Sequence, residues 1–280
     1  MGVTTVGERV REVRDDEVEF YKQNGWAKLD QLIPSDLAGE MLAAVKEKIL
    51  GADAESFNDR PERSSTVENE GGIKDYPAFR DWHYVARDQK LEPFHSVAFS
   101  RQVGRAAQRL MDRDVPVKYT VDAVGVKMPA GHGASKPTGF HQDYPSFPFD
   151  RIGQVAVWIA LDDLPADCGV MRFYSGSHRE GPLGRGGFTG VPLTERYPHI
   201  SERYELSPPL DLKAGDATVH HGLVVHGAPE NTTDIPRWAF ILGYHPGDAL
   251  YTGAPHHIFT PMQLEVDKPI DHPLAPVVYP

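Results

Sequence analysis

The part of the chain that begins at Val115 alternates short β-rich runs with turns, and this pattern constrains the fold most. The first run, residues 115–127, is rich in β-branched side chains and is bounded by Pro and Gly, which is typical of one or two strands. Further strand candidates, with turns but no helical pattern between them, are residues 154–161, 169–174, 216–221 and 237–244. This succession predicts a mainly β fold, an antiparallel sandwich or barrel.

The preceding 114 residues show helical patterns instead. A first helix should end at Asn24-Gly25, and a second should follow the capping sequence Pro34-Ser35-Asp36, which precedes apolar residues at helical spacing. Residues 100–111 have one apolar face and predict a further helix. The polar stretch at residues 52–72 predicts a long surface loop, either disordered or a lid over a site.

Length and composition fit a single globular domain. The chain has 280 residues, of which 40% are hydrophobic and 25% charged, so it is able to bury a sizeable core. We expect one domain over residues 1–280. Within it, residues 1–114 form a mostly helical flank with the lid loop, residues 115–246 the β core, and residues 247–280 the C-terminal loops.

The charge balance limits the classes of partner. A net charge of -11 argues against nucleic acid and against anionic membrane surfaces, because both attract basic proteins. The N-terminus lacks an apolar signal segment, and no run of eighteen apolar residues occurs. Cys168 is the single cysteine, which excludes an internal disulfide and suits the cytoplasm. Monomer and homodimer both remain open.

The tripeptide His141-Gln142-Asp143 is the main candidate for chemistry. With 13 His and 40 acidic residues, about two His-x-Asp/Glu matches are expected by chance, and two occur. The other, residues 178–180, lies in a polar, Gly-punctuated stretch that predicts a turn. Only the first match lies between β-rich runs and is followed, about a hundred residues later, by His226 and Arg237 in a similar setting.

Two imidazoles and one carboxylate are the set that holds Fe(II) on one face and leaves three positions open. His141 and Asp143 are two residues apart, so in an extended segment both side chains would leave the same face. His226 would come from another strand, at its start. His220 and His221 compete with His226 for this role, although they lie farther from Arg237 in the sequence.

Strand alternation puts Arg237 on one face with Ala239, Ile241 and Gly243. A guanidinium on such a small, apolar, inward face would be an unpaired buried charge unless an anion binds there. A dicarboxylic acid would supply that partner in bidentate geometry. The sequence therefore predicts an acid co-substrate next to the metal.

From Glu17 to Pro246 the chain resembles the phytanoyl-CoA dioxygenase family of Fe(II)/2-oxoglutarate oxygenases. The order and spacing of three stretches carry the resemblance. They are Lys127-Met128-Pro129 through Phe140-His141-Gln142-Asp143-Tyr144 to Phe147-Pro148-Phe149; Val157-Trp158-Ile159-Ala160-Leu161 with Gly169-Val170 and Ser175-Gly176-Ser177-His178-Arg179; and Ala214-Gly215-Asp216 through His226-Gly227-Ala228-Pro229-Glu230-Asn231 to Arg237.

The resemblance implies a double-stranded β-helix, also called a jelly roll or cupin-like fold. It implies that His141, Asp143 and His226 bind iron and that Arg237 holds the distal carboxylate of 2-oxoglutarate. Residues that match the co-substrate pocket of such proteins are Lys127, Trp158 and Ala228. Ala228 stands where the family usually has serine, so one hydrogen bond to the co-substrate should be missing. His83 is a looser match to a further pocket residue.

The implied activity is oxidation of an unactivated carbon of a small molecule with Fe(II), 2-oxoglutarate and O2, releasing succinate and CO2. Related halogenases have a small residue at the position of Asp143, so this carboxylate favours hydroxylation, desaturation or ring closure over halogenation. We expect a neutral or cationic substrate of specialised metabolism, because the chain is acidic. His256 and His257, in a C-terminal loop, are candidates to reach over the site.

Plainer interpretations compete with this assignment. Trp158 and Ala228 are equally typical of core positions, and Lys127 of a solvated strand end. A zinc hydrolase would use the same three ligands but would leave Arg237 without a co-substrate. In a non-catalytic jelly-roll binding protein the histidines would be incidental.

Overall fold

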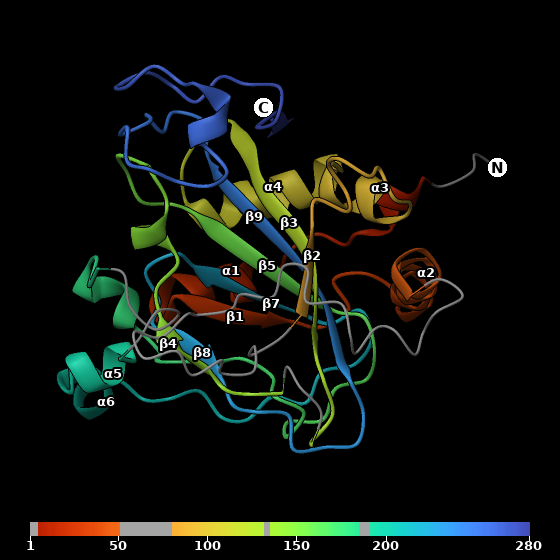
Figure 1. Ribbon diagram of the computed structural model, residues 1–280. Helices are drawn as coiled ribbons and strands as arrows, with labels where there is room; N and C mark the ends of the chain where they lie inside the picture. Colours follow the sequence, from red (N-terminus) through yellow and green to blue (C-terminus); the bar gives the residue numbers. More distant parts are fainter. Residues whose placement is uncertain (1–4, 51–79, 132–134, 185–190) are drawn as a thin grey trace.

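Two antiparallel sheets dominate the computed structural model, which describes residues 5–50, 80–131, 135–184 and 191–280 (Figure 1). The larger sheet has the strand order β1-β7-β5-β9-β3-β10, and β2 also pairs with β3. Its strands are β1 (Trp26–Leu29), β2 (Arg80–His83), β3 (Val117–Lys127), β5 (Val155–Ala160), β7 (Ala217–His221), β9 (Arg237–Pro246) and β10 (Val277–Tyr279). The loop predicted at residues 52–72 lies outside the described residues.

The smaller sheet has the order β4-β8-β6. Its strands are β4 (Thr138–His141), β8 (His226–Ala228) and β6 (Arg172–Phe173). Together the sheets form the double-stranded β-helix that the sequence predicted. The predicted strands at residues 115–127, 154–161, 216–221 and 237–244 are confirmed within a few residues, whereas the run at 169–174 contains a strand of only two residues.

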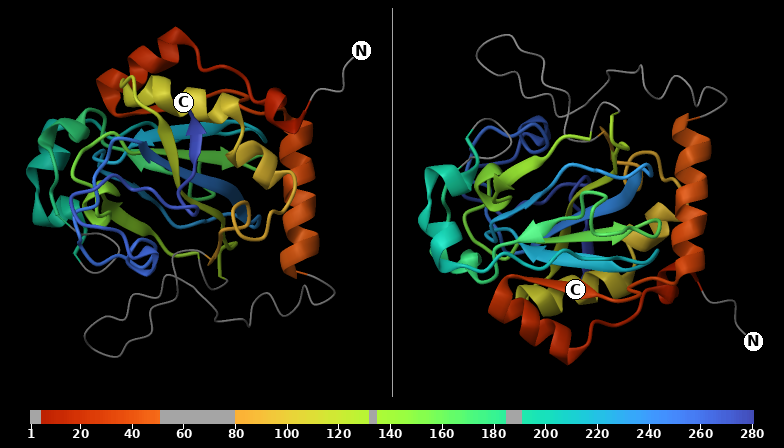
Figure 2. Two further views of the ribbon diagram at one scale, coloured as in Figure 1. Left: turned by 90° about the horizontal axis from the view of Figure 1, so that it is seen from above. Right: turned by 90° about the horizontal axis from the view of Figure 1, so that it is seen from below.

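The larger sheet has two chemically different faces, as β9 illustrates. Trp238, Phe240, Leu242 and Tyr244 belong to the main hydrophobic core. Helices cover this outer face of the sheet (Figure 2). The alternate residues, from Arg237 to His245, lie on the inner face, which is the alternation predicted around Arg237.

The helices begin and end where local chemistry requires. Helix α1 ends at Asn24 and is capped by Gly25, which has a φ of +77°, the left-handed conformation that glycine adopts without steric cost. Helix α4 begins after Ser100, whose side chain accepts a hydrogen bond from the amide of Val103. The α-helices are α1 (Asp15–Asn24), α2 (Ser35–Val45), α3 (Phe94–Ala98), α4 (Arg101–Met111), α5 (Leu193–Arg196) and α6 (His199–Arg203). The shorter helical turns are η1 (Val6–Arg9), η2 (Lys46–Leu50), η4 (Tyr144–Ser146), η5 (Ser177–Glu180) and η6 (Thr260–Met262).

One expectation about the elements was wrong: the β-rich part of the chain is not free of helices, because α5 and α6 lie between β6 and β7. The mostly helical N-terminal flank also contributes β1, which pairs with β7 at the edge of the larger sheet. In the described part of the chain, no helix has the length and apolar character needed to cross a membrane.

Candidate metal centre and anion pocket

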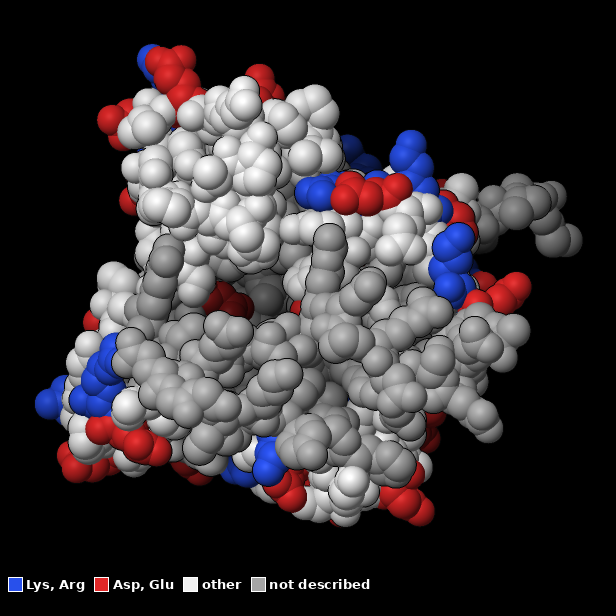
Figure 3. Space-filling view, in the orientation of Figure 1, with Lys and Arg blue, Asp and Glu red and all other residues white. Residues whose placement is uncertain are grey.

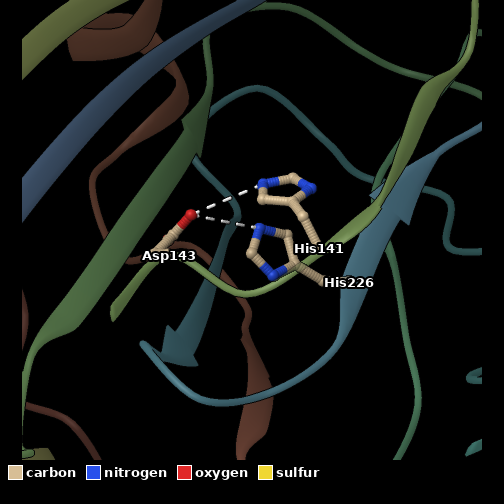
Figure 4. A group of neighbouring side chains, drawn as sticks. All are labelled: His141, Asp143 and His226. Atoms are coloured by element: carbon tan, nitrogen blue, oxygen red, sulfur yellow. Dashed lines mark ion pairs between the residues drawn. The ribbon is translucent and has the colours of Figure 1, made fainter. Parts of the chain in front are cut away.

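His141, Asp143 and His226 lie together in the folded chain (Figure 4). One ligand atom from each residue lies within 4.8 Å of the other two. Asp143 Oδ1 is 3.5 Å from His141 Nε2 and 3.7 Å from His226 Nε2. The two imidazole ring centres are 4.2 Å apart. Three donor atoms at these separations can converge on one ion with small movements, and their chemistry suits Fe(II).

The smaller sheet positions the two histidines. His141 ends β4 and His226 begins β8, and these two residues are directly paired in the antiparallel register. Side chains of a directly opposed pair leave the sheet on the same face, which brings both imidazoles together. The expectation that His226 starts a strand is therefore confirmed.

The explanation offered for Asp143 was wrong. The strand ends at His141, and Asp143 has helical backbone angles at the start of η4, where Ser146 donates to its carbonyl. Pro145 favours this short helical turn, because it fits the first turn of a helix and cannot donate to a strand ladder. A turn of the backbone, and not strand alternation, brings the carboxylate to the histidines.

Both histidine ligands are oriented by carbonyls of their own chain segments. His141 Nδ1 is 2.8 Å from the carbonyl oxygen of Gly139, and His226 Nδ1 is 3.1 Å from that of Val224. A carbonyl oxygen only accepts hydrogen bonds, so these contacts favour a proton on Nδ1 and leave the Nε2 lone pair facing Asp143. Burial, together with the neighbouring imidazoles of His141 and His220, holds the pKa of His226 well below its usual range. The neutral form is the one that binds metals.

Asp143 is ionised. Burial opposes its ionisation, but the surrounding imidazoles of His226, His141 and His220 outweigh burial and hold the pKa of Asp143 well below its usual range. The described residues thus provide a neutral imidazole and a carboxylate at neutral pH.

His220 and His221, the two competing candidates, take other positions. His220 is buried, and its Nε2 lies 3.0 Å from Asp143 Oδ2, the oxygen that faces away from the triad. His221 accepts a hydrogen bond from the amide of Leu223 and packs against His178. Neither belongs to the group that could hold a metal among the described residues.

Arg237 and Lys127 form a pair of buried basic side chains on the inner face. They are opposed in the β3–β9 register, and their exposed fractions are 3% and 0%. Arg237 Nη1 donates to the carbonyl of Gly169 at 2.7 Å, and Lys127 Nζ donates to that of Pro229 at 2.6 Å. Within the described ranges neither side chain forms an ion pair with a carboxylate, and Arg237 Nε has no partner. A buried guanidinium without a counterion, next to a buried amine, indicates an anion site.

Burial and the nearby Arg237 guanidinium lower the pKa of Lys127 to about 6, and burial lowers that of Arg237 to about 10. Arg237 therefore keeps its charge at neutral pH, whereas Lys127 is largely neutral until an anion arrives. The solvated strand end considered for Lys127 is excluded by its complete burial.

The two remaining pocket candidates flank these cations. The Arg237 guanidinium carbon lies 5.1 Å from the ring centre of Trp158, which also belongs to a buried cluster with Cys168. Ala228 lies in β8, and its carbonyl oxygen is 3.5 Å from Lys127 Nζ. Trp158 is thus a core residue that also lies against the Arg237 guanidinium.

Gly169 makes the close packing around Lys127 possible. It has a φ of +81°, and a Cβ there would lie 2.7 Å from Lys127 Cδ and 2.9 Å from the carbonyl oxygen of Pro229. We expect Gly169→Ala to destabilise the protein by about 2–3 kcal/mol, which lowers Tm by roughly 4–8 °C. Thermal unfolding checks this. The control is Gly131→Ala, which has a φ of +80° but no atom within 4 Å of the added methyl group. An equal Tm loss in both variants would contradict the packing argument.

Figure 3 shows a hollow on one face of the molecule, with acidic atoms on its floor and uncharged residues above it. Aromatic side chains gather after Asp143: the Phe147 ring stacks on Phe149 and on His256 of the C-terminal loop. His83 lies on β2 opposite Ala123, and its Nε2 is 2.5 Å from Asp81 Oδ2. Directly opposed residues share a face, so this pair lies on the inner face that carries Arg237 and Lys127. The sequence offered no signal for Asp81.

Comparison with known proteins gives a family match. The family described as "Phytanoyl-CoA dioxygenase (PhyH)" matches residues 21–239. "Phytanoyl-CoA dioxygenase 1" of Oryza sativa subsp. japonica is 31% identical over 104 residues, 36% of each chain, so the match covers about a third of the rice protein. "Dioxygenase lolE1" of Epichloe uncinata is 24% identical over 236 residues, 83% of each chain.

Solved structures are similar in fold. The non-heme alpha ketoglutarate dependent carbocyclase SnoK from nogalamycin biosynthesis superposes with a TM-score of 0.74, at 24% identity and over 99% of both chains. The epimerase SnoN, in complex with Fe3+, alpha ketoglutarate and nogalamycin RO, gives a TM-score of 0.71, at 22% identity and over 94% of this chain and 98% of its own.

Proposed function

We propose, from the premise that this chain belongs to the phytanoyl-CoA dioxygenase family, that His141, Asp143 and His226 hold Fe(II) next to a 2-oxoglutarate site built by Arg237 and Lys127. The enzyme is an Fe(II)- and 2-oxoglutarate-dependent dioxygenase. One observation carries the site assignment. A His-Asp-His triad that could hold a metal ion and two buried basic side chains without a counterion share the interior of one β-helix.

The residues fit both groups. Two imidazoles with Nδ1 fixed by carbonyls and one ionised carboxylate match the donor set of ferrous oxygenases, and leave coordination positions for other ligands. When bound, Fe(II) with 2-oxoglutarate and O2 supplies the oxidation: 2-oxoglutarate and O2 yield succinate and CO2, and an unactivated substrate C–H becomes C–OH, or the substrate is desaturated or cyclised.

The chain's own residues supply binding and orientation. Arg237 receives the distal carboxylate of 2-oxoglutarate, and its Nε, which lacks a partner, offers a further donor to that group. Trp158 forms an apolar wall against the guanidinium and helps to exclude water. Ala228 has no hydroxyl, so it contributes contact but no side-chain hydrogen bond.

A zinc hydrolase with the same ligands would leave the buried basic pair, Arg237 and Lys127, without a function, so that alternative is disfavoured.

Binding of 2-oxoglutarate should be coupled to protonation of Lys127. Its pKa of about 6 lies below neutral pH, and a bound carboxylate favours the charged amine, so the pKa rises on binding and a proton is taken up. Affinity for 2-oxoglutarate should therefore fall as pH rises above about 6, by up to about tenfold per pH unit. Titrations from pH 6.5 to 8.5 measure this effect. Lys127→Met should flatten the dependence, and a wild-type affinity that does not change with pH would contradict the assignment.

The substrate is proposed to be an uncharged small molecule of specialised metabolism. The described residues above the hollow in Figure 3 are uncharged, and Phe147 and Phe149, shortly after Asp143 in the sequence, form a stacked aromatic pair. Similar structures named for nogalamycin biosynthesis support this class. His83 and Asp81 face the same interior and would meet a polar group of the substrate. Each of these two side chains retains a buried atom without a hydrogen-bond partner, His83 Nδ1 and Asp81 Oδ1.

Residues 1–280 are proposed to form one domain, because β1 near the N-terminus and β10 near the C-terminus both join the larger sheet. A cytoplasmic location belongs to the same proposal. It is supported by Cys168, the single cysteine, which is buried and free.

Metal-dependent decarboxylation tests the proposed function without knowledge of the substrate. Purified protein given 2-oxoglutarate, ascorbate, O2 and Fe(II) should form succinate slowly even in the absence of substrate. A chelator should abolish this activity, Fe(II) should restore it, and Zn(II) should not. Succinate formation that is indifferent to metal removal, or none under any of these conditions, would refute the proposal.

A further inference from the structure

His220 contacts the candidate metal centre without belonging to it. It lies in β7, where its register partners are Trp26 of β1 and Ala156 of β5, and its exposed fraction is 3%. His220 therefore comes from the larger sheet, whereas His141 and His226 come from the smaller one. It approaches the triad from the opposite side of the β-helix interior.

The two oxygens of Asp143 have different neighbours. Oδ1 faces the histidine ligands, 3.5 Å from His141 Nε2 and 3.7 Å from His226 Nε2. Oδ2 faces His220 Nε2 at 3.0 Å. An ionised carboxylate only accepts hydrogen bonds, so His220 must carry its proton on Nε2 to donate here. His220 Nδ1 is buried without a partner, so Asp143 is the only hydrogen-bond partner of this ring in the described part of the chain.

The backbone holds Asp143 less firmly than the histidine ligands. His141 and His226 are paired within a sheet, but Asp143 follows the end of β4 in a short helical turn. Its side chain is 23% exposed, whereas those of the two histidines are 4% exposed. A carboxylate in such a position can rotate about its side-chain bonds, and a bond from a rigid strand would prevent this rotation.

We propose that His220 is a positioning residue that holds Asp143 as a one-oxygen metal ligand. The hydrogen bond occupies Oδ2 and directs Oδ1 toward the histidine ligands. A carboxylate that binds through both oxygens would occupy a further coordination position, one that the co-substrate or oxygen needs. His220 thereby keeps that position open. The inference rests on the proposed metal site and adds a residue to it.

Two matched variants separate a hydrogen bond from packing. The amide nitrogen of glutamine reaches about as far as the Nε2 of histidine, so His220→Gln can still donate to Asp143. His220→Asn has the same amide group but is too short to reach. His221→Asn is the control. His221 follows His220 on the strand, so its side chain faces the opposite side of the sheet. The asparagine oxygen can replace His221 Nδ1 as the acceptor for the amide of Leu223.

The experiment measures anaerobic Co(II) and Fe(II) binding to the full chain by calorimetry, with the visible absorption of the Co(II) protein as a second readout. His220→Asn should bind both metals about 10- to 100-fold more weakly and alter the Co(II) spectrum, as expected when a group that orients a ligand is lost. His220→Gln and His221→Asn should stay within a few-fold of the wild type. Thermal unfolding of the metal-free proteins checks that all variants fold.

The following results would overturn the inference. Unchanged metal affinity and spectrum in His220→Asn would show that the hydrogen bond has no effect on the ligand. Equal losses in His220→Gln and His220→Asn would indicate that His220 is itself a ligand or acts by packing. Wild-type protein that binds neither metal would overturn the proposed function as well, whereas wild-type binding that both variants retain would overturn this inference alone.

Discussion

Asp143→Ala should abolish Fe(II)-dependent conversion of 2-oxoglutarate to succinate, with a loss of at least about 100-fold. The substitution removes the only carboxylate of the triad, and with it the negative charge that offsets the ion's charge and fixes its position. The vacated position would be filled by solvent, so two imidazoles alone would hold the metal. Succinate formed with Fe(II), ascorbate and O2 measures the effect.

The control for this variant is Asp234→Ala, an exposed carboxylate three residues before Arg237. It removes the same charge from the protein but leaves the triad intact, so turnover should remain within a few-fold of the wild type. Equal turnover in Asp143→Ala and the wild type would exclude Asp143 as a ligand.

Arg237→Ala should raise the 2-oxoglutarate concentration required for half-maximal turnover by about 30- to 700-fold. This range corresponds to about 2–4 kcal/mol, the usual cost of removing one partner of a buried charge pair. The guanidinium is buried and would bind the distal carboxylate, which does not reach the metal. The Fe(II) requirement should therefore change by no more than a few-fold.

Arg237→Lys is the matched variant, because it retains the charge but lacks the planar fork. It should recover only part of the affinity for 2-oxoglutarate. If Arg237→Ala raised the Fe(II) requirement as much as the 2-oxoglutarate requirement, the residue would support the metal centre and not the co-substrate. An unchanged 2-oxoglutarate requirement would remove its assigned role.

The strands of the larger sheet were predictable where they are long. Strands β3 and β9 have 11 and 10 residues, with outer and inner positions of different character. Strand β1 has only four residues between two helices, and it exists because it pairs with β7, about 190 positions later in the chain. Local pattern contains no information on such a distant partner. The same limit explains the short β6, whose pairing with β8 defines it.

The residues of the candidate site were predictable from the sequence, but the neighbouring residues that contact them were less so. The motif spacing and the alternation around Arg237 identified residues that the fold brings together. The role of His220 was not foreseen, because its partner Asp143 is 77 positions away and a nearby histidine looks like a competing ligand. Alternation in β7 does place His220 on one face with Thr218, and the β5–β7 and β5–β9 registers together put that face on the side of Arg237.

The most direct measurement for the central claim is the location of iron in crystals grown anaerobically with Fe(II), by anomalous scattering at the iron edge. We predict one peak, about 2.0–2.2 Å from His141 Nε2, His226 Nε2 and Asp143 Oδ1. His220 should remain outside coordination distance, bonded to Oδ2. A peak elsewhere, or a peak without one of the three residues as ligand, would contradict the account.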